Sequence, residues 1–236
     1  MNWDQIVNKV SPYIVKIETQ TGHGTGFLSL YNETKTLCGV ATALHVVDHA
    51  DKWKQPIKII HHESEEFIFL EDDKRVIYKD YKTDSAVVLF FKDHLPFPKD
   101  LVSLLPSQTP IGIGFEVGWL GFPAVAPYDL CFFSGNISAR QEYRKAYLID
   151  GVAINGVSGG PVLFSTEAEG VQIVGTVSAY QANRATGEAL PGLLIAQDVS
   201  HFHDVANHIR SLDDANKKKR ELEKVSKQTK NSEQTH

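Results

Sequence analysis

The feature that most constrains the fold of this chain is a succession of short β-favouring runs, separated by turns and by very little helical pattern. The first block of runs lies at residues 13–18, 26–30, 36–43, 57–60, 67–70, 76–78 and 85–91, with a glycine turn expected at 22–26. The second block lies at residues 112–122, 130–137, 147–154, 161–164, 172–180 and 193–198. Many short strands with turn signals predict paired antiparallel barrels or a sandwich, and they argue against a βαβ architecture.

A proline-rich stretch separates the two blocks. Residues 94–110 contain Pro96, Pro98, Pro106 and Pro110. Proline cannot donate a backbone hydrogen bond, so it is disfavoured inside strands and common in loops. We therefore expect this stretch to cross from one β unit to the other.

Helical spacing is restricted to the two ends of the chain. Apolar residues within 2–10 recur at i, i+3, i+4 and i+7, which predicts a short amphipathic helix that ends at Pro12. Residues 199–210 show similar spacing and predict a closing helix. Residues 211–236 are charged and polar with few apolar anchors, so they form either an extension of that helix or a flexible tail.

The charge distribution argues against nucleic-acid and membrane partners. The formal net charge is −5, and residues 211–236 hold seven Lys or Arg against five Asp or Glu, so residues 1–210 carry −7. A domain of that charge is poorly suited to bind phosphate backbones. The longest stretch of low charge, residues 111–127, is interrupted by glycine and proline and is shorter than the ~20 apolar residues of a membrane helix.

The cysteines and the first residues predict the compartment. Cys38 and Cys131 are too few for a disulfide framework, and we expect both to be buried as small hydrophobic residues. The first residues show no basic segment followed by an apolar segment, as a secretory signal would. We therefore expect a cytoplasmic protein.

The histidines include two pairs that resemble metal-ligand spacing, His61 with His62 and His201 with His203. Neighbouring strand residues point to opposite faces of a sheet, and no cysteine or acid cluster completes either set. We therefore expect no metal site and no cofactor.

Residues 156–161, Gly-Val-Ser-Gly-Gly-Pro, surround Ser158 with three glycines. Glycine clusters are entropically costly unless the backbone needs positive φ or a close approach. One such use is an oxyanion hole, in which the amides of Gly156 and Ser158 bind a carbonyl oxygen beside the attacking hydroxyl. The motif also fits the elbow of α/β-hydrolases, but residues 161–164 read as a strand where that elbow needs a helix. A glycine-rich loop without catalysis is the third interpretation.

A serine nucleophile needs a base, usually a histidine oriented by a carboxylate. His45 follows small and apolar residues that would hold its imidazole at the end of a strand. Asp84 precedes a strongly apolar run, where its carboxylate can be half-buried. Asp48 and Asp80 compete for the same role, although Asp80 lacks an apolar strand directly after it. His45 and Asp84 lie in the first block and Ser158 in the second, so the three would meet between the two blocks.

These segments resemble the trypsin-like, chymotrypsin-fold serine peptidases, and within them the HtrA-like bacterial branch. The resemblance is carried by Thr-Ala-Leu-His-Val-Val at 42–47, Asp-Ser-Ala-Val at 84–87 and Gly-Val-Ser-Gly-Gly-Pro at 156–161, with weaker similarity at 10–12, 24–27 and 153–155. It implies an all-β fold of two six-stranded antiparallel β-barrels, about residues 12–95 and 110–198. These would form a protease domain over residues 1–210, with short N-terminal and C-terminal helices and a charged tail at 211–236. The family's PDZ domain does not fit into that tail.

The resemblance also implies an activity. His45 would act as general base, Asp84 would orient it, and Ser158 would be the nucleophile beside the oxyanion hole formed by the amides of Gly156 and Ser158. The expected function is that of a serine endopeptidase that works through an acyl-enzyme and needs no cofactor.

Three further expectations concern the substrate and the loop. Val152 takes the position at the floor of the family's specificity pocket and offers no carboxylate to Lys or Arg, so we expect an apolar or small residue before the scissile bond. Ser178, Ala179 and Tyr180 correspond to the strand that pairs with the substrate backbone. Val157 stands where the animal digestive members carry an aspartate that pairs with a new N-terminus, so other contacts or the substrate must order this loop.

The alternative function is a catalytically silent trypsin-like module, a pseudoprotease that binds a peptide or partner protein without cleaving it. In either case we expect protein or peptide ligands. A cytoplasmic protease without zymogen chemistry needs restraint, so we also expect a regulatory protein partner, with residues 211–236 as a candidate docking segment. The sequence leaves the oligomeric state open.

Overall fold

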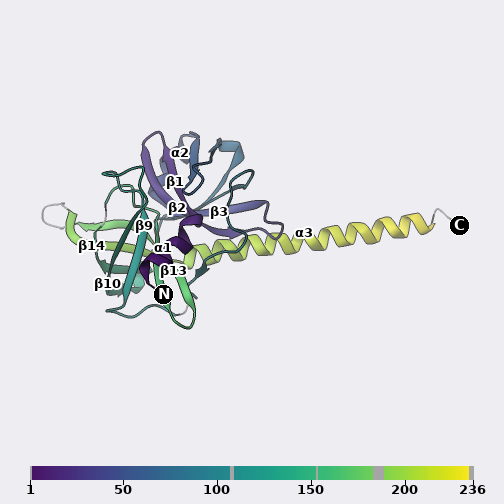
Figure 1. Ribbon diagram of the computed structural model, residues 1–236. Coiled ribbons are helices and arrows are strands. Elements are labelled where there is room, and N and C mark those ends of the chain that lie inside the picture. Colours follow the sequence, from purple (N-terminus) through teal and green to yellow (C-terminus); the bar gives the residue numbers. More distant parts are fainter. Residues whose placement is uncertain (1, 107–108, 153, 183–188, 234–236) are drawn as a thin grey trace.

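The computed structural model describes the backbone of residues 2–106, 109–152, 154–182 and 189–233, and it describes side chains in these ranges except at 179–182, 189–191 and 225–233. Two β units lie next to each other, with a short helix near the N-terminus and a long helix that projects from the body (Figure 1). The expected all-β fold is confirmed.

The first β unit is a seven-stranded antiparallel sheet in the order β5-β4-β1-β2-β3-β7-β6. Its strands are β1 (Ile14–Thr19), β2 (Gly22–Tyr31), β3 (Leu37–Ala43), β4 (Ile57–His61), β5 (Phe67–Leu70), β6 (Val76–Asp80) and β7 (Ser85–Phe91). The expected glycine turn at 22–26 is wrong: β2 begins at Gly22, and only the tip at residues 19–22 turns. Close packing explains the glycine at position 26, because a Cβ on Gly26 would lie 2.7 Å from Val40 Cγ1.

This first sheet is a half-barrel rather than a closed barrel. Within residues 2–106, no strand pairing joins the edge strands β5 and β6. Helix α2 (Leu44–Lys52), which the sequence analysis did not predict, buries Leu44, Val47 and Ala50 against the sheet. Beside it, the buried guanidinium of Arg75 donates hydrogen bonds to the carbonyls of Leu70 at the end of β5 and Ala50 in α2. The Arg75 side chain thus links the end of the edge strand β5 to α2.

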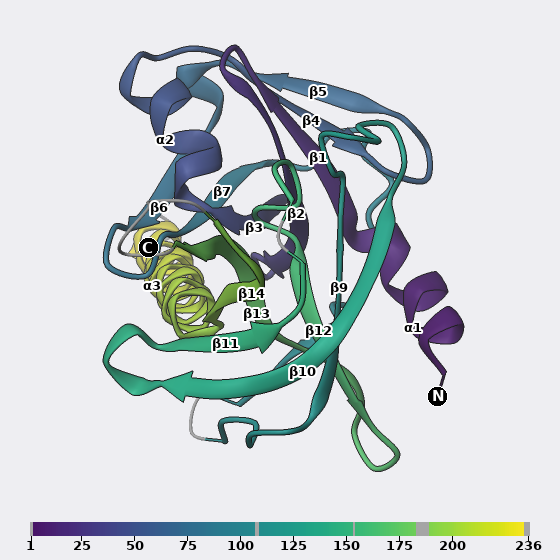
Figure 2. The ribbon, with the colours of Figure 1, turned by 90° about the vertical axis from the view of Figure 1, so that its left-hand side faces the viewer.

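The second β unit is a closed barrel (Figure 2). Its strands are β9 (Glu116–Gly121), β10 (Cys131–Gln141), β11 (Ala146–Asp150), β12 (Pro161–Thr166), β13 (Gly170–Ala182) and β14 (Ala189–Asp198). They pair in the order β12-β9-β10-β11-β14-β13, and the pairing of β12 with β13 closes the ring. The short strand β8 (Ser103–Leu104), in the proline-rich connection, adds in parallel to β13.

One hydrophobic core joins the two units. Phe27, Ala41 and Val87 from the first sheet pack in the same cluster as Leu120 and Val177 from the barrel. Burial of apolar area at about 25 cal/mol per Å² drives this packing. The loops at the junction of the two units are therefore attached to elements that share one hydrophobic core.

Helix α1 (Trp3–Val10) packs against the barrel through its apolar face, as its spacing predicts. The Asn2 side chain caps it by accepting a hydrogen bond from the Gln5 amide at 2.9 Å. Trp3 lies against Phe132 with 5.1 Å between ring centroids, and its Nε1 donates to Glu116 at 3.0 Å.

The cysteines are free in the described structure. Cys38 is fully buried, as expected, and burial raises the pKa of its thiol to about 12. Cys131 lies at the start of β10 and is only partly buried, so the expectation of a buried residue does not hold there.

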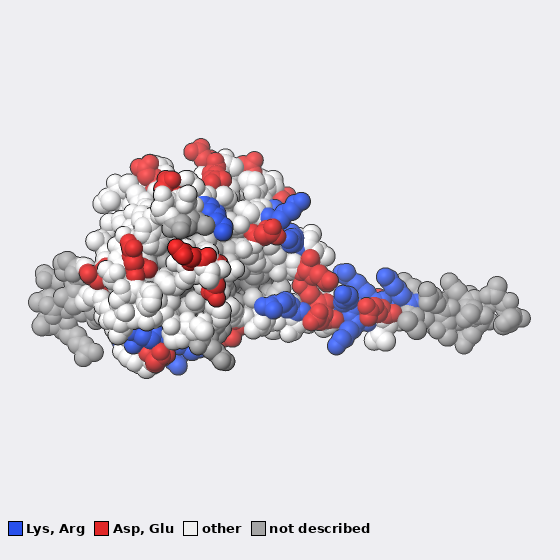
Figure 3. Space-filling model, turned by 60° about the horizontal axis from the view of Figure 1, so that its bottom comes forward, with Lys and Arg blue, Asp and Glu red and all other residues white. Residues whose placement is uncertain are grey.

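Helix α3 runs from Ser200 to Glu233, so residues 211–233 extend the closing helix, and residues 234–236 lie outside the described residues. Its first turns bury Phe202, Val205 and Ile209 in the shared core. Lys217 still reaches Glu33 of the body, at 3.7 Å, and the rest of the helix projects from the body (Figure 1). Its described exposed part carries both basic and acidic side chains (Figure 3). Among the described residues, no helix is long and apolar enough to span a membrane.

Phe202 is the main anchor of α3, because it is fully buried and meets Phe27 edge to face at 5.8 Å. We predict that Phe202→Ala lowers the free energy of unfolding by about 3–5 kcal/mol, since it leaves a core cavity. Leu222→Ala, on the exposed part of the same helix, should change it by less than about 0.5 kcal/mol. Urea unfolding of both variants tests this, and equal effects would contradict the assigned anchor.

Candidate active site

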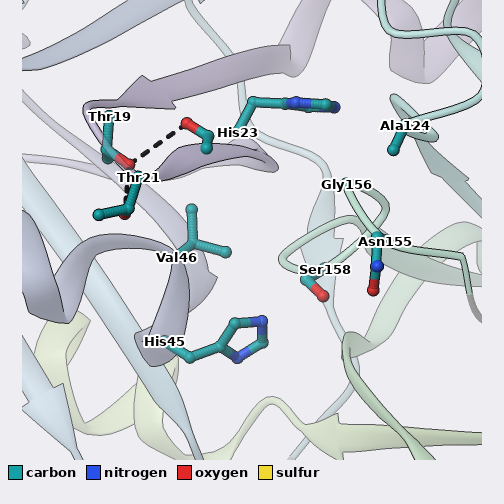
Figure 4. Close-up of a pocket in the computed structure, with 10 residues that line it drawn as sticks. Thr19, Thr21, His23, His45, Val46, Ala124, Asn155, Gly156 and Ser158 are labelled. Atoms are coloured by element: carbon teal, nitrogen blue, oxygen red, sulfur yellow. Dashed lines mark hydrogen bonds between the residues drawn. The ribbon is translucent and has the colours of Figure 1, made fainter.

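A pocket of about 350 Å³ lies where the two β units meet. His45 and Val46 of α2 line one side, and Asn155, Gly156 and Ser158 of the loop before β12 line the other (Figure 4). Residues of the β1–β2 turn, His23 and Ala124 complete the wall. The imidazole of His45 and the hydroxyl of Ser158 both point into this pocket.

His45 and Asp84 are held together by two hydrogen bonds. The distance from His45 Nδ1 to Asp84 Oδ2 is 2.8 Å, and the His45 backbone amide donates to Asp84 Oδ1 at 3.0 Å. The Leu44 amide donates to the Asp84 carbonyl at 2.9 Å. The carboxylate thus sits at the N-terminus of α2, where free amides and the helix dipole favour a negative charge.

Asp84 itself lies in the left-handed region, with φ +49°. Asp visits this region more readily than most residues, although at some cost in strain. A third donor, the hydroxyl of the buried Ser178, reaches Asp84 Oδ2 at 2.6 Å. Three donors from two β units therefore fix the carboxylate that faces His45.

The competing carboxylates are occupied elsewhere. Asp48 binds Lys52, Lys79 and Tyr81. Burial acts to raise the pKa of Asp48, but hydrogen bonds from Lys52 and Tyr81 and nearby lysine charges lower it overall. Asp80 accepts hydrogen bonds from the Thr83 hydroxyl and the residue 82 amide.

The hydroxyl of Ser158 forms a hydrogen bond with a backbone carbonyl of β13 and not with His45 in the described structure. It donates a long hydrogen bond, 3.5 Å, to the carbonyl of Ser178, and within the described residues no hydrogen bond joins it to His45. Hydrogen bonds of a catalytic pair are often loose before a substrate binds. A rotation about the Ser158 side-chain bond would be needed to bring Oγ to the imidazole.

The backbone of the loop leaves two amides free beside Ser158. Gly156 has φ +92°, and the carbonyl of Asn155 is turned outward to accept a hydrogen bond from the Ala124 amide at 2.7 Å. Because a trans peptide places C=O and N–H on opposite sides, the Gly156 amide points the other way. Among the described residues, neither this amide nor that of Ser158 has an acceptor.

Of the residues expected to contact substrate, neither Val152 nor Ser178 is among the described residues that line the pocket. Ser178 lies in β13, and its hydroxyl contacts Asp84, a contact for which no sequence pattern provides a signal. Val152 directly follows β11 and is 52% exposed. Ala179 and Tyr180 continue β13, where they pair with Ile195 and Leu194, but their side chains lie outside the described residues.

The other histidines bind protein groups. His61 contacts the Ser64 hydroxyl and the Pro12 carbonyl, and His201 and His203 contact backbone carbonyls. In the part of the chain that is described, no group of three or more His, Cys, Asp or Glu is placed to hold a metal ion.

Solved structures with the same fold include two crystal structures of Rv3671c. The Rv3671c protease in an inactive form is 21% identical with a TM-score of 0.59, covering 86% of this chain and 92% of that one. An inactive form of a serine-to-alanine mutant of Rv3671c from M. tuberculosis H37Rv is 19% identical with a TM-score of 0.59, covering 86% and 89%. The crystal structure of Deg5 matches at 19% identity and a TM-score of 0.59, covering 84% and 91%.

These likenesses establish the trypsin-like fold that the sequence motifs imply. No protein-family model matches the sequence, and comparison with curated proteins finds no match.

Gly156 is required by both its φ and its surroundings. A Cβ there would lie 2.3 Å from the Phe122 carbonyl oxygen, whereas a Cβ on Gly170, with φ +72°, would meet nothing within 4 Å. We predict that Gly156→Ala costs about 1–3 kcal/mol more in the free energy of unfolding than Gly170→Ala, because it adds a clash to a similar backbone strain. Denaturant unfolding measures both, and equal costs would contradict the packing described for this loop.

Proposed function

We propose that the protein is a serine endopeptidase that cleaves peptide bonds with His45, Asp84 and Ser158. The observation that carries this proposal is the shared pocket, in which an aspartate-bound imidazole and a serine hydroxyl beside two free amides line the same cavity. The trypsin-like fold of its structural neighbours supports the same reaction class.

The proposed reaction follows from these positions. His45 Nδ1–H donates to Asp84, which leaves the Nε2 lone pair to accept the Ser158 proton. As Ser158 Oγ bonds to the substrate carbonyl carbon, the negative oxygen is held by the free amides of Gly156 and Ser158. The C–N bond then breaks, and His45 gives its proton to the leaving amine. Water repeats the sequence and releases the acyl group.

The alternative, a pseudoprotease that binds without cleaving, has one supporting observation. The Ser158 hydroxyl is bound to the Ser178 carbonyl instead of to His45. If that bond persisted in solution with ligand present, the serine would stay inactive.

A fluorophosphonate separates the two functions, because only an activated serine attacks its phosphorus and displaces fluoride. We predict stoichiometric labelling of the wild-type protein at Ser158 and none in Ser158→Ala. Asp84→Asn should lower kcat for peptide cleavage by about 10⁴-fold, since the imidazole loses the partner that fixes its tautomer. Asp48→Asn, a matched loss of a carboxylate that binds lysines, should leave kcat within threefold. Unlabelled wild type, under conditions that label a control protease, would exclude the peptidase.

For the substrate, we propose an apolar or small residue before the scissile bond, because Val152 supplies no carboxylate for a cation. Peptide-library profiling should show this preference in the wild-type protein. Val152→Asp should raise cleavage after Lys or Arg at least tenfold, because it adds an opposite charge. Val76→Asp, an exposed valine on β6, is the control and should change nothing. Strong cleavage after Lys or Arg by the wild type would contradict the proposal.

We also propose a cytoplasmic location, supported by free cysteines of which one is fully buried. The proposed ligands are proteins or peptides, and a regulatory protein partner would meet the exposed part of α3 at residues 214–224.

A further inference from the structure

Residues 154–160, the described loop around Ser158, contain no charged side chain that could hold the loop by an ion pair. Val157 is fully buried, and a Cβ on the facing Gly121 would lie 2.8 Å from its Cγ1. A buried valine fixes the loop by packing, but packing does not determine which way each peptide group points. Hydrogen bonds must decide whether the amides or the carbonyls face the pocket.

Thr25 of β2 supplies those hydrogen bonds. Its side chain is fully buried, and its hydroxyl donates to the Gly156 carbonyl at 2.9 Å while it accepts from the Phe122 amide at 3.1 Å. Its own amide donates to the Ser158 carbonyl at 2.8 Å. Its carbonyl accepts from the Thr42 hydroxyl at 2.7 Å. All the polar groups of Thr25 are therefore engaged, and three of these four bonds reach across to the barrel.

The neighbouring residues hold the same segment from the other side. His23, two residues before Thr25, places Nε2 3.0 Å from the Phe122 carbonyl. The segment that begins at Phe122 includes Ala124, whose amide holds the Asn155 carbonyl outward at 2.7 Å. The carbonyls of Asn155 and Gly156 are thus both bound away from the pocket, and the Gly156 amide between them is left free.

We propose that Thr25 is a positioning residue that sets the oxyanion loop in its working orientation, in the role that a buried ion pair fills in the animal digestive members. The proposal rests on the proposed peptidase function. The hydroxyl is the essential element, because it bridges Phe122 of the barrel to Gly156 of the loop. The loop is then set by folding, and no chain cleavage is needed to order it.

The decisive variants change the hydroxyl and little else. Thr25→Val keeps the shape but leaves the Phe122 amide and the Gly156 carbonyl without partners. The peptide group between Gly156 and Val157 is then free to turn, and Gly156, whose amide faces the pocket, loses its support on that side. Thr25→Ser keeps the hydroxyl. Ser29→Ala is the matched control, because Ser29 is a buried hydroxyl in the same strand that donates to the Gly39 carbonyl, at 3.1 Å, without touching the loop.

The first readout is the rate of fluorophosphonate labelling, measured on the whole chain. We expect Thr25→Val to label at least 30-fold more slowly than wild type, because Gly156 is no longer held in place and its amide shifts; full loss of one oxyanion donor costs about 10²–10³ in rate. Thr25→Ser and Ser29→Ala should label within threefold of wild type. Normal labelling of Thr25→Val would overturn the proposal and leave the peptidase function intact.

The second readout needs no activity. Hydrogen exchange of residues 154–160, followed by mass spectrometry, should be at least tenfold faster in Thr25→Val than in wild type, Thr25→Ser and Ser29→Ala. Equal exchange would overturn the proposal, even if the wild type proved inactive and the proposed function failed. If Thr25→Val does not fold, Thr25→Ala removes the same hydroxyl and leaves space in place of the valine methyl groups, with the same two readouts and the same outcomes expected.

Discussion

The hydrogen bond from the Thr25 amide to the Ser158 carbonyl, 2.8 Å long, joins the two β units where the candidate site forms. It requires strand β2 to approach the loop closely, and glycine makes this approach possible. A Cβ on Gly24 would lie 3.1 Å from the Ser158 carbonyl oxygen and 2.6 Å from a methyl of Val46. The half-barrel, the barrel and the loop around Ser158 are thus held in a defined relative position, or register.

The carboxylate of Asp84 is the second element that depends on this register. It is bound by His45 from its own β unit and by Ser178 from the barrel. A shift of one unit against the other would break one of these bonds and leave a partly buried charge with fewer donors, which is costly. The same contacts that dock the two units therefore also orient the imidazole.

Much of this arrangement could be predicted from the sequence, because it is encoded locally. Most strands of the structure coincide with runs of β-favouring residues in the sequence. The glycines around Ser158 predict a backbone with positive φ, and Gly156 and Gly159 adopt it. Helix α2 is not predicted, because its apolar residues directly follow a β-favouring run. Leu44, Val47 and Ala50 recur at every third position, which is the signal that indicates a helix.

The remainder depends on contacts between residues far apart in the chain. The buried Arg75 binds the carbonyls of Leu70 and Ala50, and the sequence carries no local signal for this choice of partners. The bond between Ser178 and Asp84 spans 94 positions, and that between Thr25 and Gly156 spans 131. The orientation of each peptide group around Ser158 is decided by such bonds, so the motif alone could not give it.

The most direct measurement is a crystal structure of the protein with a peptidyl boronic acid that carries an apolar residue next to boron. The account predicts a bond from Ser158 Oγ to boron, with one boronate oxygen about 2.7–3.1 Å from the amides of Gly156 and Ser158. His45 should stay bound to Asp84 in that complex. A boronate that leaves Ser158 unmodified, or whose oxygens turn away from both amides, would contradict the claim that these residues form one preorganised catalytic site.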